Sequence, residues 1–375
     1  MKNQESRIKG GAKGVLSKPV IRYSLFVILK RWWCKNIWHK LLGILITLVL
    51  IVIGGAYGIS RWYALKHADE PMQMGTTFIA NYTRYLGLDP KETFHAILYD
   101  LGTKRVRLVS YWREGEPKPG QYEFKELDWQ FRMAEEAGAK VSLAIGLRQP
   151  RWPECHMPKW AEDKPMTEWA PQLKVYMQKV IERYKDSPAL ESYQLENEFF
   201  MKIFGDCPDH TRERLVDEYN FVKSLDSEHP VIITRSNNWG GVPIHEPTPD
   251  QFGVAVYKRV WDQNLTHRYF EYPYPPWFYG FLGGMGEIVS GKSIIIHELQ
   301  AEPWIPDGLE LKTSSLEEQD KSVNADRLAK RFDYARDTGI RTIDAWGVEW
   351  WYWRMVKHND PSLWNVAKKE FARRD

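Results

Sequence analysis

Eight short runs of strand type alternate with amphipathic segments over most of the chain, and this alternation constrains the fold more than any other feature. Most of the runs are rich in Val, Ile and Leu, as is typical of parallel strands that are covered on both faces. Eight alternations in roughly 300 residues predict an α/β fold, the (β/α)8 barrel. The predicted strands are residues 76–82, 105–112, 140–147, 190–198, 231–236, 252–257, 292–299 and 339–346.

The segments between the predicted strands have the periodicity of helices. Residues 128–138 place apolar side chains three and four positions apart and end on Gly138, which suits a helix C-terminus. Residues 168–184 repeat the pattern, with Trp169, Leu173 and Val180 on one face. An open, doubly wound sheet is the alternative fold. It would need a glycine-rich phosphate turn after the first strand, and the sequence has none there.

A run without any charged residue, from residue 41 to residue 60, follows a strongly basic N-terminus. A helix of about this length crosses ~30 Å of hydrocarbon. Residues 1–40 contain ten Lys and Arg and one Glu, and such a positive flank stays in the cytoplasm. We therefore predict a cytoplasmic tail (1–40), a transmembrane signal anchor (41–60), a juxtamembrane linker (61–75) and an extracytoplasmic domain (76–375). A cleaved signal peptide and a buried helix are weaker alternatives, because the run is long and no A-x-A cleavage site follows closely.

The chain beyond the tail is mildly acidic, since the whole chain carries +3 and the tail alone +9. This balance argues against nucleic acid as a partner of the folded body. Of the three cysteines, Cys34 falls in the tail, whereas Cys155 and Cys207 fall in the part that we predict to be exported. These two could form a disulfide or remain free thiols. No CxxC or HExxH pattern indicates zinc, and we expect neither metal nor cofactor.

Two glutamates stand at the ends of predicted strands. Glu198 closes the fourth strand directly after Asn197, and Glu298 closes the seventh. The chemistry of a β/α barrel gathers at the mouth where its strands end, and the fourth and seventh strands face each other across it. Two carboxyl groups ~5–5.5 Å apart could cleave a glycosidic bond with retention, one protonating the leaving oxygen and the other attacking the anomeric carbon.

Neighbouring residues compete for these roles. Glu302 and Glu349 follow the seventh and eighth strands and are rivals of Glu298. His297 should point out of the barrel because side chains alternate along a strand, and we assign it no role. The segment 272–281, with three prolines and several aromatic residues, is either a lid or a patch that faces a bilayer.

The order of these motifs along the chain resembles clan A of the glycoside hydrolases, over about residues 75–365. The resemblance rests on Asn197-Glu198 after the fourth strand and Glu298 after the seventh. The second strand, from Arg105 to Trp112, resembles the clan's strand whose arginine supports the nucleophile. The segment 120–128 resembles the clan's entry into the following helix, and Tyr257 and Trp346 match aromatic residues that close strands six and eight.

The resemblance implies a role for each matching residue. Glu198 would be the general acid and then the general base, and Glu298 would be the nucleophile. Asn197 would hold the sugar's 2-hydroxyl. The predicted supporting and substrate-binding residues are Arg107, which has Arg105 as its competitor, together with Tyr257, Trp346 and Trp112. Trp346 would lie under the sugar at the point of cleavage.

These observations predict a membrane-anchored, retaining glycoside hydrolase that acts on an oligo- or polysaccharide with β-linkages. Aromatic residues in the loops would stack on sugar rings. The first alternative is a catalytically inactive barrel that binds glycans at the cell surface. The second is an acyl or phosphoryl hydrolase, but no G-x-S-x-G motif and no His/Asp cluster supports it.

Overall fold

The computed structural model describes residues 37–201, 205–235 and 246–373. It divides into two compact units, residues 1–55 and 56–375. Most of the predicted cytoplasmic tail lies outside the described residues, and only residues 37–40 of it are seen, at the start of a helix. We describe the two units separately.

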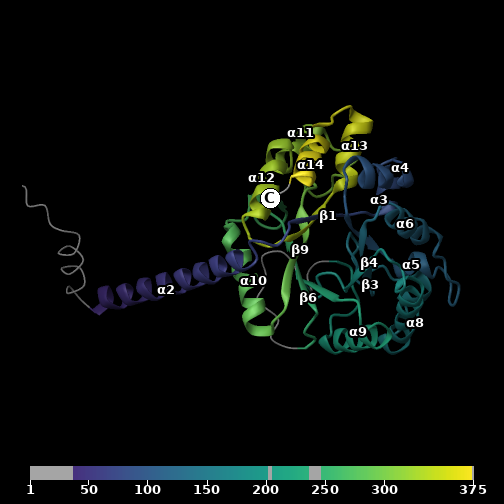
Figure 1. Ribbon diagram of the computed structural model, residues 1–375, viewed down its shortest axis with the longest axis horizontal. Coiled ribbons are helices and arrows are strands. Elements are labelled where there is room, and N and C mark those ends of the chain that lie inside the picture. Colours follow the sequence, from purple (N-terminus) through teal and green to yellow (C-terminus); the bar gives the residue numbers. More distant parts are fainter. Residues whose placement is uncertain (1–36, 202–204, 236–245, 374–375) are drawn as a thin grey trace, which may run out of the picture. The chain divides into compact units, whose positions relative to one another are not determined.

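Eight parallel strands close into a barrel in the second unit, in the order β1-β10-β9-β6-β5-β4-β3-β2, with helices around them (Figure 1). The predicted (β/α)8 fold is therefore confirmed. The strands are β1 (Gln73–Thr77), β2 (Arg105–Val109), β3 (Lys140–Ile145), β4 (Leu190–Leu195), β5 (Val231–Arg235), β6 (Gln251–Val256), β9 (Ser293–Gln300) and β10 (Thr342–Trp346).

The helices of the chain alternate with these strands, and several additional ones lie in the loops. They are α2 (Ile37–Lys66), α3 (Ala80–Tyr85), α4 (Pro90–His95), the π-helical η1 (Ala96–Asp100), α5 (Trp112–Gly115), α6 (Lys125–Glu136), α7 (Lys159–Glu162), α8 (Met166–Tyr184), α9 (Arg212–Leu225), α10 (Pro276–Ser290), α11 (Leu316–Ser322), α12 (Ala325–Arg336), α13 (Val348–His358) and α14 (Ser362–Ala372).

Several strands end earlier than the sequence predicts. β4 stops at Leu195, so Glu198 lies in the loop that follows it, where Glu196 and Glu198 have positive φ angles of 51° and 44°. A left-handed backbone breaks an extended strand, and hydrophobic periodicity does not reveal it. β2 likewise stops at Val109, which places Trp112 at the start of α5.

A two-stranded hairpin that we did not predict lies between β6 and α10. Its strands are β7 (Arg259–Asp262) and β8 (Arg268–Glu271), and they pair antiparallel. The hairpin follows the C-terminal end of β6 and therefore belongs to the mouth of the barrel.

The prediction that His297 points out of the barrel is wrong. Val254 of β6 pairs with Ile296 of β9, but the next residue, Ala255, pairs with Glu298, so His297 is an extra residue in its strand. Such a β-bulge interrupts the alternation of side chains. His297 is consequently buried inside, with Nε2 3.3 Å from Ser142 Oγ on the far side of the barrel.

Residues 61–75, which the sequence analysis predicts as a juxtamembrane linker, contain regular structure at both ends. The helix α2 continues to Lys66, and β1 begins at Gln73. Within the second unit, Ser60 and Tyr63 are buried, and Lys66 Nζ lies 2.7 Å from Glu287 Oε2 of α10. The start of the barrel unit therefore includes the last turns of α2.

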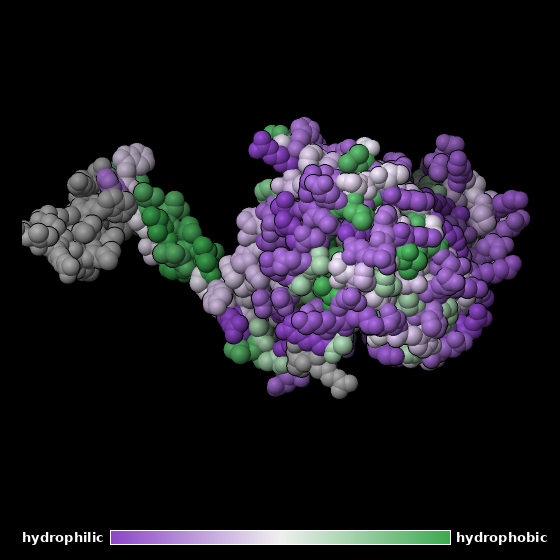
Figure 2. Space-filling model, turned by 90° about the horizontal axis from the view of Figure 1, so that it is seen from above, coloured by the Kyte–Doolittle hydropathy of each residue, from purple (hydrophilic) through white to green (hydrophobic). Residues whose placement is uncertain are grey.

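The helix α2 is long and apolar enough to cross a membrane, by its length and composition. Figure 2 shows the hydrophobic residues gathered along it. They include almost all of the uncharged run that the sequence analysis assigns to a transmembrane anchor.

Candidate active site

The interior of the barrel is polar at its base. Arg105 Nε donates to Asp344 Oδ1 at 3.1 Å, and His297 Nδ1 lies 2.6 Å from Asp344 Oδ2. Burial lowers the pKa of His297 to about 4, so its ring is neutral at pH 7. Because Asp344 can only accept when ionised, Nδ1 donates to it and Nε2 accepts from Ser142. Arg105, the predicted competitor of Arg107, therefore belongs to this basal network.

Glu298 lies above this network and receives two hydrogen bonds. Arg107 Nη2 donates to Glu298 Oε2 at 3.3 Å, and the Tyr257 hydroxyl donates to Glu298 Oε1. Arg107 is fully buried and is held by Thr77 Oγ1 at 2.8 Å and Gln194 Oε1 at 3.2 Å. Its guanidinium is thus fixed where it stabilises the negative charge of Glu298. The bulge at His297 is what turns Glu298 toward these donors.

Glu198 lies in the loop after β4, and its backbone N–H donates to Thr234 Oγ1 of β5 at 2.9 Å. Its side chain is 7% exposed. Burial raises the pKa of Glu198 well above the usual range, and the negative charges of Glu298 and Glu154 raise it further. Burial and the neighbouring negative charges thus both favour the protonated form of Glu198, which is the form that a general acid needs.

Asn197 connects Glu198 to a third carboxyl group, which the sequence analysis missed. Asn197 Nδ2 donates to Glu154 Oε2 at 2.9 Å, and Asn197 Oδ1 accepts from Gln194 at 2.7 Å. Glu154 is buried, and burial raises its pKa to about 7 against the opposing effects of Arg148 and Asn197. The only sequence signal for Glu154 was its position next to Cys155 in the loop after the third strand.

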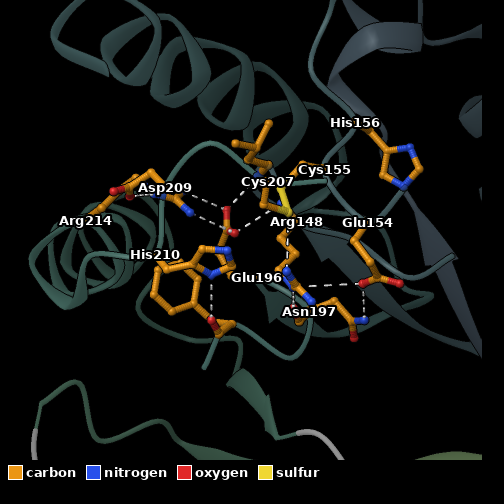
Figure 3. Close-up of a disulfide and its surroundings, with 12 residues drawn as sticks. Arg148, Glu154, Cys155, His156, Glu196, Asn197, Cys207, Asp209, His210 and Arg214 are labelled. Carbon is orange, nitrogen blue, oxygen red and sulfur yellow. Dashed lines mark hydrogen bonds and ion pairs between the residues drawn. A yellow bond between two sulfur atoms is a disulfide. The ribbon is translucent and has the colours of Figure 1, made fainter. Parts of the chain in front are cut away.

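The loops after β3 and β4 are joined by a disulfide between Cys155 and Cys207, shown with its surroundings in Figure 3. Below it, Arg148 Nε donates to the Asn197 carbonyl oxygen. The carboxylate of Glu196 accepts from Arg214 at 3.1 and 3.2 Å.

Glu196 also explains Gly146. The φ angle of Gly146 is 98°, and a Cβ atom there would lie 2.4 Å from Glu196 Oε1. Only glycine fits this turn, which brings the loop after β3 against the loop after β4.

Trp346 ends β10 as predicted, but a guanidinium lies over its ring. Arg151 Cζ is 4.5 Å from the centroid of Trp346 and 3.3 Å from that of Tyr82. Both terminal nitrogens of Arg151 donate to Glu302, each at 3.1 Å. In this conformation the indole is 7% exposed. A sugar that stacked on Trp346 would therefore meet Arg151, and nothing in the sequence indicated this pair.

The rivals of Glu298 have other partners. Glu302 forms the ion pair with Arg151, and Glu349 of α13 accepts from the Ile79 backbone N–H. Burial raises the pKa of Glu349 to about 7. Both carboxyl groups thus belong to the surroundings of Trp346.

The assignment of Trp112 to substrate binding is corrected by the structure. Its side chain is fully buried, its Nε1 donates to Glu116 at 2.7 Å, and Trp160 packs edge-on against it. An indole with no exposed surface can touch no ligand. The reason is that β2 stops at Val109, so Trp112 starts a helix instead of closing a strand.

Within the described ranges, no group of three or more His, Cys, Asp or Glu side chains could hold a metal ion. The arrangement is a barrel mouth in which one carboxyl group is surrounded by donors and two others are buried beside it. Such a site can offer both a proton donor and a carboxylate nucleophile to one bond of a substrate.

We compared the chain with known protein families, curated sequences and solved structures. No protein-family model and no curated protein sequence matches the chain. Solved structures do match. A β-galactosidase from the Antarctic haloarchaeon Halorubrum lacusprofundi matches with a TM-score of 0.52 and 13% identity, over 73% of this chain and 52% of that one. A β-galactosidase from Rahnella sp. R3 matches with a TM-score of 0.52 and 11% identity, over 80% and 55%.

A GH5_18 protein from Bifidobacterium longum, solved in complex with Manβ1-4GlcNAc, matches with a TM-score of 0.53 and 11% identity, over 73% of this chain and 68% of that one. The chain has the barrel fold of clan A glycoside hydrolases, as the sequence predicts. It spans only about half the length of the two β-galactosidases. Identities this low establish the fold alone.

Proposed function

We propose that this protein is a retaining glycoside hydrolase that cleaves β-linked sugars, anchored in a membrane by α2, with the barrel outside the cytoplasm. Glu198 is the acid/base and Glu298 the nucleophile. The observation that carries the proposal is the contrast between the two carboxyl groups. Glu298 accepts from Arg107 and Tyr257, whereas the pKa of Glu198 is raised by burial and by neighbouring negative charge. Two carboxyl groups with opposed environments are the signature of an acid paired with a nucleophile.

In the first step, Glu198 gives its proton to the glycosidic oxygen while a carboxylate oxygen of Glu298 attacks the anomeric carbon. The carbon–oxygen bond to the leaving group breaks, and a covalent glycosyl-enzyme forms. Glu298 is then a neutral ester, which keeps the hydrogen bonds that Arg107 and Tyr257 donated to its carboxylate.

In the second step, Glu198 is ionised and takes a proton from water, which attacks the same carbon and releases Glu298. Two inversions give net retention. Asn197 lies next to the acid, and its amide is oriented by Gln194 and Glu154. We expect its amide to contact a hydroxyl of the sugar that is bound beside Glu198.

The test uses a panel of 2,4-dinitrophenyl β-glycosides and the variant Glu298→Ala. We expect the rate to fall by about 10³-fold or more, because removal of a nucleophile abolishes the step that depends on it. Azide should restore turnover and give a glycosyl azide of the opposite anomeric configuration, since the small anion attacks from the vacated face.

Glu302→Ala is the matched control, because Glu302 follows the same strand but pairs with Arg151. It should show no azide response. If Glu298→Ala keeps full activity on a substrate that the wild type cleaves, or if azide rescues Glu302→Ala instead, the assignment of the nucleophile fails. If the wild-type protein cleaves no member of a broad panel but binds glycans, the alternative of an inactive glycan-binding barrel holds.

A further inference from the structure

The loop that follows β3 crosses the mouth of the barrel. Gln149 exchanges two hydrogen bonds of 2.8 Å with the backbone of Ser110, which directly follows β2. The Tyr111 hydroxyl donates to the carbonyl oxygen of Pro150 at 2.6 Å. The loop is therefore fixed over the end of β2 before it reaches Arg151.

Arg151 extends this path over three further strands. Its guanidinium contacts the rings of Tyr82, in the helix that follows β1, and Trp346, at the end of β10. It then pairs with Glu302, which follows β9. In the order of the barrel, β9 lies opposite β3, so this ion pair joins loops from opposite sides of the mouth. We call Tyr82, Arg151, Glu302 and Trp346 the bridge.

The bridge is packed into the barrel unit. Its two aromatic residues are each 7% exposed, and Glu302 is 9% exposed. The φ angle of Gly347 is 117°, and a Cβ atom there would lie 2.4 Å from Glu302 Cβ, so glycine allows the close approach. Burial lowers the pKa of His156 to about 3, and its neutral ring donates from Nε2 to the Arg151 carbonyl oxygen at 3.1 Å. Both ends of Arg151 are thus held in place.

The position of the bridge relative to the carboxyl groups decides which part of a substrate meets it. Glu198 follows β4, and β10, which ends at Trp346, lies opposite β4 in the barrel. The leaving group must lie on the side of Glu198, because Glu198 gives its proton to the leaving oxygen. The sugar that becomes bonded to Glu298 therefore extends away from Glu198, toward β10 and the bridge.

Arg151 also has a donor that the protein does not use. Arg151 Nε is buried, and no atom of residues 37–201, 205–235 or 246–373 accepts a hydrogen bond from it. A buried donor without an acceptor is unfavourable. A terminal sugar has a free hydroxyl where an internal sugar carries the next unit, and the oxygen of such a hydroxyl is an acceptor. A terminal sugar would therefore suit the bridge both in size and in hydrogen bonding.

We propose that this protein removes single sugars from the non-reducing end of a glycan. This inference rests on the proposed function and makes its substrate class more specific. An enzyme that cleaves inside a chain binds sugars on both sides of the cleaved bond. Here the bridge occupies the space that a second sugar would need on the side away from Glu198. Arg151 and Glu302 thus determine specificity and do not take part in the chemistry.

The position of cleavage is read from the products of the wild-type full chain. The sugar that the panel identifies is presented as a 4-nitrophenyl β-1,4-bioside, and as the same bioside blocked at its non-reducing end by a 4,6-O-benzylidene acetal. The free bioside should yield the monosaccharide first and nitrophenol only after a lag. The blocked form should react at least about 100-fold more slowly, because its extra ring meets the bridge. Early release of the intact disaccharide, or equal rates on both forms, would overturn the proposal.

Arg151→Gly tests the bridge itself, since glycine suits the φ angle of 86° at this position. It should release nitrophenol and the intact blocked disaccharide at least about tenfold faster than the wild type. The control is Arg84→Ala, because Arg84 is an exposed residue of α3 that pairs with Glu126. It should give the wild-type products. A folded Arg151→Gly with unchanged products would refute the role of the bridge, and if this variant does not fold, the wild-type products decide.

A binding measurement needs no turnover. Isofagomines of the gluco, galacto and manno configurations are compared with the same compounds extended by one β-linked sugar on the non-reducing side. The wild type should bind the single ring of its preferred configuration at least about tenfold more tightly than the extended form. Equal or tighter binding of the extended form would contradict the proposal. The azide response of Glu298→Ala reports on the mechanism alone, so its failure is recognised separately from failure of the bridge.

Discussion

Three carboxyl groups share the centre of the site, and each differs in what surrounds it. Glu298 accepts from a cation and a phenol, Glu198 is buried beside the other two, and Glu154 accepts from the Asn197 amide. The pKa values of Glu154 and Glu198 are both raised, first of all by burial. Like charges in a buried site make protonation of one group depend on the state of the others.

The first prediction concerns Glu154→Gln, which keeps an acceptor for Asn197 but removes a charge. Above pH 7, Glu154 is ionised, and its charge raises the pKa of Glu198. Without that charge, Glu198 loses its proton at a lower pH. The alkaline limb of kcat/KM should therefore move to lower pH by about half a unit or more.

The measurement is a pH–rate profile on a β-glycoside with a poor leaving group, for which protonation by Glu198 matters most. Glu310→Gln, in an exposed loop after β9, is the control and should leave the limb in place. An unchanged limb in Glu154→Gln, or one that moves to higher pH, would show that Glu154 does not act on the acid.

At the scale of the elements, the site depends on irregular backbone. The bulge at His297 lets two consecutive side chains of β9 face inward, one to the basal network and the next to Arg107 and Tyr257. The left-handed residues after β4 likewise place Asn197 and Glu198 beside the loop that follows β3. The regular strands form the scaffold, whereas the bulge and the left-handed residues determine the directions of the Glu298 and Glu198 side chains.

The second prediction concerns the disulfide that joins the loops after β3 and β4. Cys155 and Cys207 are 52 residues apart, and a cross-link of that span commonly contributes about 2 to 4 kcal/mol by restricting the unfolded chain. The free energy of unfolding of the double variant Cys155→Ser/Cys207→Ser should therefore be lower by that amount, and its denaturation midpoint should fall accordingly.

The measurement is equilibrium denaturation under oxidising conditions. Cys34→Ser removes a cysteine but leaves the disulfide, and it should match the wild type. Addition of reductant should bring the wild type to the midpoint of the double variant. Identical midpoints with and without the disulfide would contradict the prediction.

At the scale of the molecule, the barrel unit begins at residue 56, inside α2, whereas the sequence analysis predicts its start at residue 76. Ser60 and Tyr63 are buried, and the backbone of residues 67 and 68 accepts hydrogen bonds from Arg341. The last turns of α2 thus cover the face of α10 and the base of the barrel.

The third prediction follows from this arrangement. The free energy of unfolding of a fragment of residues 73–375 should be lower than that of a fragment of residues 56–375, by at least about 2 kcal/mol. The reason is that the shorter fragment lacks the buried Tyr63 and exposes the apolar surface against which Tyr63 packs. Thermal unfolding of the two purified fragments measures the difference. In the longer fragment, Tyr63→Ala should reproduce part of the loss, and Trp62→Ala, at an exposed position, should not. Equal melting temperatures for both fragments would contradict the prediction.

The sequence by itself determined the barrel, the helix that can span a membrane and the two glutamates, together with Asn197, Arg107 and Tyr257 around them. These features could be predicted because local sequence patterns indicate them: the period of apolar residues, an uncharged run and the order of polar residues at strand ends. Hydropathy and alternation along a strand are properties of neighbours in the chain.

Only the tertiary structure decided that His297 faces inward, that Arg151 covers Trp346, that Glu154 meets Asn197 and that α2 packs on α10. Each of these depends on residues far apart in the chain. The bulge in β9 is defined by its register with β6, and the cover on Trp346 comes from a loop after another strand. Contacts of this kind are set by how whole elements pack, and no local pattern encodes them.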